Sequence, residues 1–592
     1  MNKIQNFQKL IKKHNLDAYI IPTSDYHNSE YISSYFKGRQ YLSGFDGSAG
    51  TLIVTKDQAF LWTDGRYYIQ AAKQIENKPI ELMKQGTIDV PTINDFLQKT
   101  LLNNSVLGFD GKVVSTNFAL NLIKDLPNIV INSNLDLIGE FWQERPSLPL
   151  SQLFILDLDY SGMTFENKLS KIRREMQKLN ADAHIICSLE DQAWLYNLRG
   201  NDVQHTPVFL AYTYISNDEC HIFIDNKKID SVVRDYLDSK KIIIHEYFEF
   251  YDFIKKINNN KILMDFNKVN YTIYLELSKH DNTFINALDP SLMMKAIKND
   301  IEIKNTINAH IKDGVAFTKF MHFLKTNIKT GQLSEISVSD YLEKERKKQN
   351  GFVDLSFNTI CAYKEHAAMM HYSATKNTDY HLETNGLILI DSGGHYLEGT
   401  TDITRTISLG KISQDEKKHF TLVLKAMINL SNAIFLEGCT GQNLDILARG
   451  PIWKELLDYK CGTGHGVGYL LSVHEAPNGF RWKKTTDRND SAILRPGMIT
   501  TNEPGIYLEN KYGIRIENEM LCINKGSNEF GNFLGFQTIT FAPIDLDAIE
   551  VTLLNNDEKK WLNQYHNDVF NTISPYLNNE EKEWLKLYTR EI

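Results

Sequence analysis

The residues best able to do chemistry begin in a segment where two aspartates flank a turn. A short apolar run ends at Asp391, which predicts a buried strand. Gly393 and Gly394 follow and supply the backbone freedom that a hairpin or tight bend needs. Asp391 and Asp402 are equidistant from a point near residue 396, so folding the chain back there would bring the carboxylates together. Two facing carboxylates repel unless a cation lies between them, although one such pair could also be surface decoration.

A second segment repeats this design with two glutamates. Glu503 and Glu517 flank a midpoint at Asn510, inside an obvious turn. His465 lies between the two segments, in a loop at 462–468 whose glycines permit close backbone approach. Four carboxylates and one imidazole suit two divalent transition ions that share bridging carboxylates, and the oxygen-rich shell favours manganese.

The order of these five residues resembles that of the pita-bread metallopeptidases, a superfamily that contains methionine aminopeptidase, prolidase and aminopeptidase P. Any one residue is a weak signal, but all five in order are specific. Within the superfamily the chain most closely resembles the three-domain, eukaryotic-type cytosolic Xaa-Pro aminopeptidases, over nearly its full length. Three further segments fit this subfamily, at 370–373, 473–477 and 536–543.

The resemblance implies a role for each of the five residues. Asp391 would bind one metal, His465 and Glu503 would bind the other, and Asp402 and Glu517 would bridge the two. A bridging hydroxide would attack the scissile carbonyl, because two cations lower the pKa of bound water, and Glu503 would accept its proton. The implied cofactor is two divalent ions, with Mn expected first and Zn or Co as alternatives.

The same resemblance assigns four neighbours of the metals. His371 and His474 would face the site, stabilise the tetrahedral intermediate and move protons. Arg515 and Tyr507 flank ligands and would tune the shell. Without the resemblance, either histidine could be an ordinary satisfied polar residue, and Arg515 could be part of a structural ion pair.

One residue departs from the family pattern. The family has histidine four residues before the metal-binding histidine, whereas this chain has Cys461 before His465. The missing imidazole is expected to contact substrate near the proline, so we expect substrate affinity, pH dependence or preferred peptide length to differ. An accessible thiol there would also be sensitive to oxidation or soft metals.

The elements that position these residues follow a duplicated N-terminal plan. A helical stretch, a buried strand, a glycine-terminated segment and a further strand occur twice in the same order, which suggests two related α/β domains joined near 146–149. Chance similarity of two α/β segments is the alternative. The strands expected in the two copies are 17–21 and 60–64, then 182–186 and 221–225, with a helix at 168–179 before the second pair.

We therefore predict a multidomain α/β and α+β chain, in which two related α/β domains precede a pita-bread catalytic domain. The predicted domains are 1–148, 149–288 and 289–592, the last with a C-terminal extension from about 530. Helices are expected at 301–328 and about 415–437. The extension should open with a strand near 533 and continue as helices rich in Trp, Tyr and Leu.

Composition narrows the class of protein. The chain has 592 residues, 42% of them apolar and 23% charged, which is typical of a globular enzyme with several domains. Its net charge of −9 argues against a nucleic-acid partner. Six scattered cysteines and the lack of a long apolar run predict a cytoplasmic protein without a membrane span. Residues 1–16 could resemble a transit peptide, but they lack Arg and Ser, and a surface helix is favoured.

The predicted function is a metalloaminopeptidase that hydrolyses the N-terminal Xaa-Pro bond of peptides with proline at position two. The alternatives are a prolidase that cleaves only dipeptides, and a non-catalytic pita-bread binding protein. The duplicated N-terminal domain and the long tail disfavour prolidase, and the five ligands disfavour the binding protein. The aromatic-rich tail and the resemblance suggest a homodimer, although an apolar helix can equally pack on its own domain.

Overall fold

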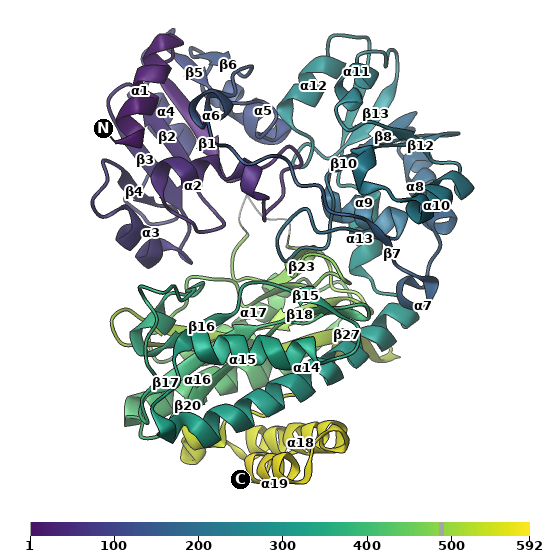
Figure 1. The fold of residues 1–592 in the computed structure, drawn as a ribbon. Coiled ribbons are helices and arrows are strands. Elements are labelled where there is room, and N and C mark those ends of the chain that lie inside the picture. Colours follow the sequence, from purple (N-terminus) through teal and green to yellow (C-terminus); the bar gives the residue numbers. More distant parts are fainter. Residues whose placement is uncertain (1, 485–489) are drawn as a thin grey trace. The chain divides into compact units, whose positions relative to one another are not determined.

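The computed structural model describes residues 2–484 and 490–592, and the chain forms two compact units (Figure 1). Unit 1 comprises Met1–Asp157 and Met163–Ser291, and unit 2 comprises Leu158–Gly162 and Leu292–Ile592. Each unit has apolar cores of its own. The boundaries predicted at 148 and 288 stay predictions.

Unit 1 contains two six-stranded sheets with one topology. If the six strands of each sheet are numbered along the chain, their order across the sheet is 4-3-2-1-5-6. Strands 1, 2 and 3 pair antiparallel, and strands 4, 5 and 6 pair parallel to their neighbours at the two sides of this trio. The duplication predicted from sequence is therefore present. The first sheet contains β1 (Ala18–Pro22), β2 (Thr51–Thr55), β3 (Ala59–Thr63), β4 (Glu81–Lys84), β5 (Val106–Gly108) and β6 (Val130–Asn132). The second contains β8 (Ala183–Ile186), β10 (Ala211–Ser216), β11 (Cys220–Ile224), β12 (Ile243–His245), β13 (Lys261–Met264) and β14 (Thr283–Asn286).

The repeat extends to single hydrogen bonds. Asp17 precedes the first strand of one copy and accepts from the Val106 amide at 2.7 Å. Asp182 holds the matching position in the other copy and accepts from the Lys261 amide at 2.8 Å. In both copies the carboxylate satisfies the start of the fifth strand, which fixes the parallel pairing of strands one and five.

Helices connect these strands. The helix predicted at 168–179 is α8 (Phe165–Lys178), which begins at the Thr164 cap. The first copy contains α1 (Lys3–Lys13), α2 (Gly38–Ser43), α3 (Tyr68–Ile75), α4 (Ile93–Thr100), α5 (Thr116–Asp125) and α6 (Leu137–Phe141). The second contains α8, α9 (Leu189–Tyr196), α10 (Ser231–Ser239), α11 (Glu249–Ile254) and α12 (Tyr271–Leu277), with β7 (Phe154–Ile155) paired to β9 (Leu198–Arg199).

Unit 2 contains four sheets in its described residues. The largest has the order β21-β28-β27-β24-β22-β23 and supplies three segments of the site discussed below. Its strands are β21 (Ile434–Leu436), β22 (Gly464–Gly466), β23 (Glu475–Phe480), β24 (Ile499–Asn502), β27 (Asn518–Asn528) and β28 (Gly531–Thr538). The small sheets are β16 (Ile360–Tyr363), β17 (Leu387–Ser392) and β20 (Ile403–Ser408); β15 (Phe352–Leu355), β18 (Gly394–Tyr396) and β19 (Gly399–Thr400); and β25 (Gly505–Leu508) with β26 (Tyr512–Arg515).

The predicted helices of unit 2 are confirmed with one correction. The first is α14 (Asp300–Asn327), which starts at a capping box of Asn299 and Glu302. The helix predicted to 437 is α16 (Gln414–Ser431), and residues Ile434–Leu436 form β21 instead. Its centre, Phe435, is buried between two exposed neighbours, and this alternation suits an edge strand better than a helix. The other helices are α7 (Leu158–Ser161), α15 (Glu335–Lys347) and α17 (Gly441–Trp453), with α13 (Pro290–Ala296) where the chain passes between units.

The C-terminal segment opens with a strand and continues as helices, as predicted. Strand β28 pairs with β27, and α18 (Asn556–Ile573) and α19 (Asn579–Tyr588) follow, drawn in yellow in Figure 1. The buried Arg405 donates to Tyr565 of α18 at 2.7 Å and to the carbonyls of Ala542 and Glu517. Arg405 thus links the extension to the backbone of Glu517. Among the described residues no helix has the length and apolar character needed to cross a membrane.

Candidate metal centre

The first hairpin turns one residue later than predicted. In the ladder of β17 and β20, Asp391 lies opposite Thr404 rather than opposite Asp402. The shift arises because β18 and β19 form a further tight hairpin in which Tyr396 pairs with Gly399. Asp402 precedes Thr404 by two residues, so it lies on the same face as Asp391 and diagonal to it. The two carboxylates still share a face.

The second hairpin turns where the sequence predicts. Asn510 is in the left-handed region with φ 60°. The ladder of β24 and β27 and the ladder of β25 and β26 have one register, in which partner numbers always sum to the same value. Glu503 and Glu517 therefore stand at opposite positions in the gap between the ladders. Interrupting the pairing there frees both carboxylates to face the centre.

His465 enters from β22 through two close backbone approaches. A Cβ at Gly464 would lie 1.9 Å from the Thr501 carbonyl oxygen, and one at Gly466 would lie 2.3 Å from that of Glu475, so neither position admits a side chain. His465 Nδ1 lies 3.0 Å from the Gly466 carbonyl, which can only accept, so Nδ1 carries the proton. Nε2 is then the unprotonated atom available as a ligand.

These residues converge. Ligand atoms of Asp402, His465 and Glu517 all lie within 4.8 Å of one another. Nε2 of His465 is 3.5 Å from Asp402 Oδ2 and 3.4 Å from Glu503 Oε1. Asp391 is reached through Arg515, whose guanidinium contacts its Oδ2. Three of the five predicted ligands thus lie together, Glu503 lies beside His465, and Asp391 is linked to Glu503 through Arg515.

Without a cation, burial and the close approach of these carboxyl groups raise their pKa values. Burial raises the pKa of Asp402 well above its ordinary value, and the nearby carboxylates of Asp391, Glu503 and Glu519 raise it further. Burial, and after it Asp402, likewise raise the pKa of Glu517. The pKa of Glu503 is raised mainly by burial, against the opposing effects of His465 and Arg515. Bound cations would lower these pKa values, because they favour the ionised carboxylates.

The hydrogen bonding of individual carboxylate oxygens indicates that the centre fits metal ions. Oε2 of Glu517 accepts from the Thr404 hydroxyl at 2.7 Å, and Oδ2 of Asp391 accepts from Arg515. The second oxygens, Glu517 Oε1 and Asp391 Oδ1, are buried without a hydrogen-bond partner among residues 2–484 and 490–592. A buried acceptor without a donor is costly, and a cation would satisfy it. An oxygen-rich set with one imidazole suits two divalent ions.

The two predicted histidines lie in segments beside the ligands. The ring of His474 meets that of His465 edge to face, with centroids 4.3 Å apart and an interplanar angle of 77°. His371 is half-buried and follows Met370, whose carbonyl lies 3.4 Å from Arg515 Nη2. The roles of both histidines stay predictions.

Arg515 is 3% exposed and ties the two hairpins together. It contacts Asp391 of the first hairpin, donates to the Tyr507 hydroxyl at 2.5 Å, and donates to Thr404 Oγ1 at 3.1 Å. Its Nε also lies 3.9 Å from Glu503. These contacts favour a role in holding the ligand shell.

Sequence reasoning missed three supporting residues. Thr404 donates to Glu517, and Thr501 Oγ1 donates to Glu503 Oε1 at 3.3 Å. Glu519 accepts from the Asp402 amide at 2.6 Å. Each lies two residues from a ligand, and this alternation, which places both side chains on one strand face, is the signal that could have found them.

Cys461 lies close enough to the site for the charge of Glu503 to affect the pKa of its thiol. Burial raises the pKa of its thiol to about 11, with Glu503 adding to the rise, so the thiol is neutral at physiological pH. The residue is half-buried, and its carbonyl accepts from Arg449 at 3.3 Å. A neutral thiol cannot supply the charge that an imidazolium could.

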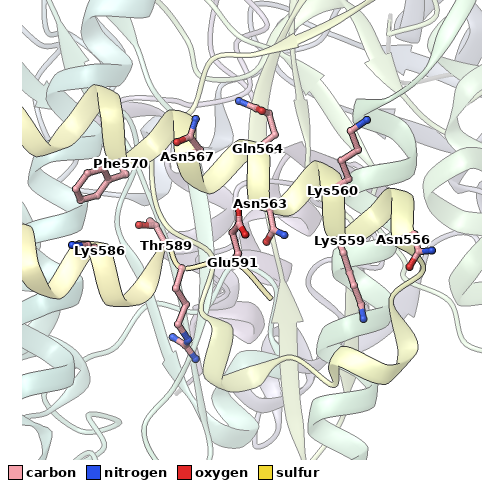
Figure 2. Close-up of a pocket in the computed structure, with 11 residues that line it drawn as sticks. Asn556, Lys559, Lys560, Asn563, Gln564, Asn567, Phe570, Lys586, Thr589 and Glu591 are labelled. Carbon is pink, nitrogen blue, oxygen red and sulfur yellow. The ribbon is translucent and has the colours of Figure 1, made fainter.

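A separate surface hollow of about 910 Å³ lies on the C-terminal helices and contains none of the site residues. Its lining comes from α18, α19 and the residues that follow. In Figure 2 the side chains of Lys559 and Lys560 point to different sides of α18, so these cations do not converge on one ligand. The hollow carries no chemistry that relates to the metal centre.

Comparisons with known proteins match nearly the whole chain. Residues 304–524 match Metallopeptidase family M24, and residues 3–138 and 144–302 each match the Creatinase/Prolidase N-terminal domain. Residues 532–592 match the C-terminal region of peptidase M24. The predicted fold class, with two related N-terminal domains before the catalytic domain, is confirmed.

Individual relatives cover nearly the full length. The Probable Xaa-Pro aminopeptidase P of Laccaria bicolor is 37% identical over 97% of this chain and 90% of its own. An X-prolyl aminopeptidase structure from Caenorhabditis elegans, described as a cytosolic enzyme with a di-nuclear active site, has a TM-score of 0.93 at 34% identity, covering 98% of this chain and 95% of that one. A Xaa-Pro dipeptidase from Bacillus anthracis has a TM-score of 0.51 at 26% identity and covers 65% of this chain and 99% of its own.

Proposed function

We infer from its membership of the Xaa-Pro aminopeptidase P family of M24 metallopeptidases that this chain hydrolyses the N-terminal Xaa-Pro bond of peptides, with two divalent metal ions. The dipeptidase alternative is weaker, because the dipeptidase spans only 65% of this chain while almost its whole length is used. A non-catalytic binding protein would have no need of the converged ligands.

The observation that carries the proposal is the convergence of Asp402, His465 and Glu517 within 4.8 Å. We propose that Asp391 holds one ion, that His465 and Glu503 hold the other, and that Asp402 and Glu517 hold both. When bound, two such ions would polarise the scissile carbonyl and would lower the pKa of water at the site. Manganese is proposed for the oxygen-rich donors, with Zn or Co as alternatives.

The chain's own groups then move protons, stabilise the developing charge and keep the site residues in place. Glu503 accepts the proton that water loses as it attacks the carbonyl carbon. His371 and His474 stabilise the negative charge that develops on the carbonyl oxygen and deliver a proton to the leaving proline nitrogen. Arg515 keeps Asp391, Glu503 and Tyr507 in place, consistent with its position between the hairpins.

An assay with three peptides tests this function. The manganese-loaded protein should release the first residue from an Xaa-Pro-Yaa-Zaa tetrapeptide, and this release should stop when the second residue is alanine. A prolidase would cleave only the Xaa-Pro dipeptide, and a binding protein would cleave neither. Cleavage of the dipeptide alone would therefore overturn the proposal.

We further propose a cytoplasmic homodimer. All six cysteines are free thiols, as expected in a reducing compartment, and cell fractionation tests this location. The tail aromatics Trp561 and Trp584 pack against the core of their own unit. An apolar patch near the end of α17 is the better candidate for the interface.

The patch consists of Trp453, Trp482 and Leu456. The two indole rings lie 6.0 Å apart, and Leu456 is 95% exposed. Exposed apolar patches mark association surfaces. Sedimentation of Leu456→Glu should show monomers, whereas Phe530→Glu, which changes a 74% exposed residue of the β27–β28 turn, should stay dimeric. A monomeric unsubstituted protein would refute the dimer.

A further inference from the structure

A fully buried carboxylate of unit 2 has no part in the chemistry described so far. Glu335 is the first residue of α15 and has no exposed surface. Burying a carboxylate is costly unless donors surround it, and here both oxygens are supplied. Oε1 accepts from the Tyr363 amide at 2.8 Å and from His366 Nδ1 at 2.9 Å, and Oε2 accepts from the Tyr372 hydroxyl and the Tyr380 amide, each at 3.0 Å.

The donors are themselves fixed. A carboxylate can only accept, so His366 must carry its proton on Nδ1. The ring of His366 lies between those of Tyr372 and Tyr380, with centroids 4.4 and 3.9 Å away. The Tyr372 hydroxyl also lies 3.0 Å from the Thr378 carbonyl, but a carboxylate is the stronger acceptor.

These contacts enclose a short segment of chain. His366 lies five residues before His371, and Tyr372 follows His371 directly. Between them, the Met370 carbonyl lies 3.4 Å from Arg515 Nη2. The backbone that carries His371 is therefore held by Glu335 on both sides and by Arg515 in the middle.

We propose that Glu335 is a positioning residue for the reaction. By accepting hydrogen bonds from His366 and Tyr372, it fixes the position of His371. The inference rests on the role proposed for His371. An imidazole that moves protons must be placed closely, because a misplacement of about 1 Å can cost roughly 100-fold in rate. A buried carboxylate with four donors resists displacement, since moving the segment would leave charge without partners.

The first test is Glu335→Gln in the manganese-loaded enzyme. The amide keeps the shape but turns an NH2 group toward two donors, whichever way it is oriented, so the segment must shift. We expect kcat to fall between about 10- and 100-fold while KM for the tetrapeptide and metal content change less than about twofold. Glu345→Gln is the matched control, because Glu345 is a buried glutamate at the other end of α15 that contacts Lys348. Its kcat should stay within about twofold of the unsubstituted enzyme.

A double variant separates positioning from general damage. If Glu335 acts through His371, then adding Glu335→Gln to His371→Ala should lower kcat no further than His371→Ala does alone. Losses that multiply would overturn the proposal, as would unchanged kcat in Glu335→Gln.

Tyr372→Phe keeps the proposal testable if Glu335→Gln does not fold. It removes one donor and should lower kcat several-fold with metal retained, again without further effect beside His371→Ala. A normal kcat in Tyr372→Phe would then contradict the positioning role of Glu335. Failure of the proposed function is distinguished by the unsubstituted enzyme: if His371→Ala retains full kcat on the tetrapeptide, the role of His371 is wrong whatever Glu335 does.

Discussion

The hydroxyl of Thr404 donates a 2.7 Å hydrogen bond to Oε2 of Glu517 and leaves Oε1 of that carboxylate without a protein donor in the described chain. Arg515 Nε donates to the same hydroxyl at 3.1 Å, so the Thr404 proton is directed at Glu517. One oxygen of the proposed bridging ligand is thus satisfied by protein and the other is left for a cation. Several consequences of this design can be measured.

Thr404→Val removes the hydroxyl but preserves shape. We expect manganese affinity to fall about 10- to 100-fold, the usual cost of losing a group that orients a ligand, with little change in fold. Isothermal titration of the metal-free protein with manganese measures this. Thr318→Val is the control, because Thr318 is equally buried and its hydroxyl has no hydrogen-bond partner in residues 2–484 and 490–592. Equal manganese affinity in Thr404→Val and the unsubstituted protein would contradict the orienting role.

Metal removal should change how stability depends on pH. Asp402, Glu503 and Glu517 have raised pKa values without metal, so the folded state retains protons that the unfolded state releases. The free energy of unfolding of metal-free protein should therefore decrease as pH rises above the ordinary values of 3.8 and 4.5 toward the raised ones. Denaturant titrations at several pH values, with and without manganese, measure this effect. A pH dependence that is the same with and without the metal would show that the carboxylates are not coupled to it.

Chelation should abolish activity reversibly, and manganese should restore it better than magnesium or calcium. The reason is that the imidazole of His465 favours a transition ion over a hard cation. Turnover after dialysis against chelator and readdition of each ion gives the order. Full turnover by protein shown to be metal-free would rule out the two-metal centre.

Substitutions at the proposed ligands and at the histidine proposed to move protons should have different effects. Asp402→Ala should lose both metal and turnover, because it removes a proposed bridge. His474→Ala should keep its metal and lose at least about 100-fold in kcat, the lower range for proton-transfer assistance. Metal analysis beside steady-state kinetics separates the two. Loss of metal with normal turnover per bound ion in His474→Ala would reverse its assignment.

Cys461→His introduces the imidazole that the family resemblance leads us to expect at this position. Because the thiol has a pKa of about 11, the present side chain is neutral, whereas histidine would be partly charged below pH ~7. We expect a lower KM for tripeptides and longer substrates, by about 1–2 kcal/mol, fading as pH rises above ~7, with metal content unchanged. Kinetics from pH 6 to 8 measure it, with Cys439→His, at another half-buried cysteine, as the control. Identical KM values at every pH would mean that the replacement has no functional weight.

Much of the fold could be predicted from the periodicity of apolar residues and from the glycine and proline residues that end segments. The duplicated N-terminal domains follow from two runs of the same element order, and α14 follows from a long helical pattern of apolar residues. The end of α16 was missed because β21 continues an apolar pattern, and only its pairing with β28 makes it a strand. Such pairing joins residues about a hundred positions apart, which local pattern does not reveal.

The sequence by itself determined the proposed donor set, its order and the face on which each carboxylate lies. Residue type decides what can bind a metal, and the count of residues in an antiparallel hairpin decides the face, so a shift of two in the first hairpin left Asp391 and Asp402 together. Only the tertiary structure decided the register itself and the support of the ligands. The Thr404–Glu517 bond, the contact of Arg515 with Asp391, and the grip of Glu335 on Tyr372 join residues 37 to 124 positions apart. Distances between such residues are set by how strands and helices pack, because nothing in the local chain constrains them.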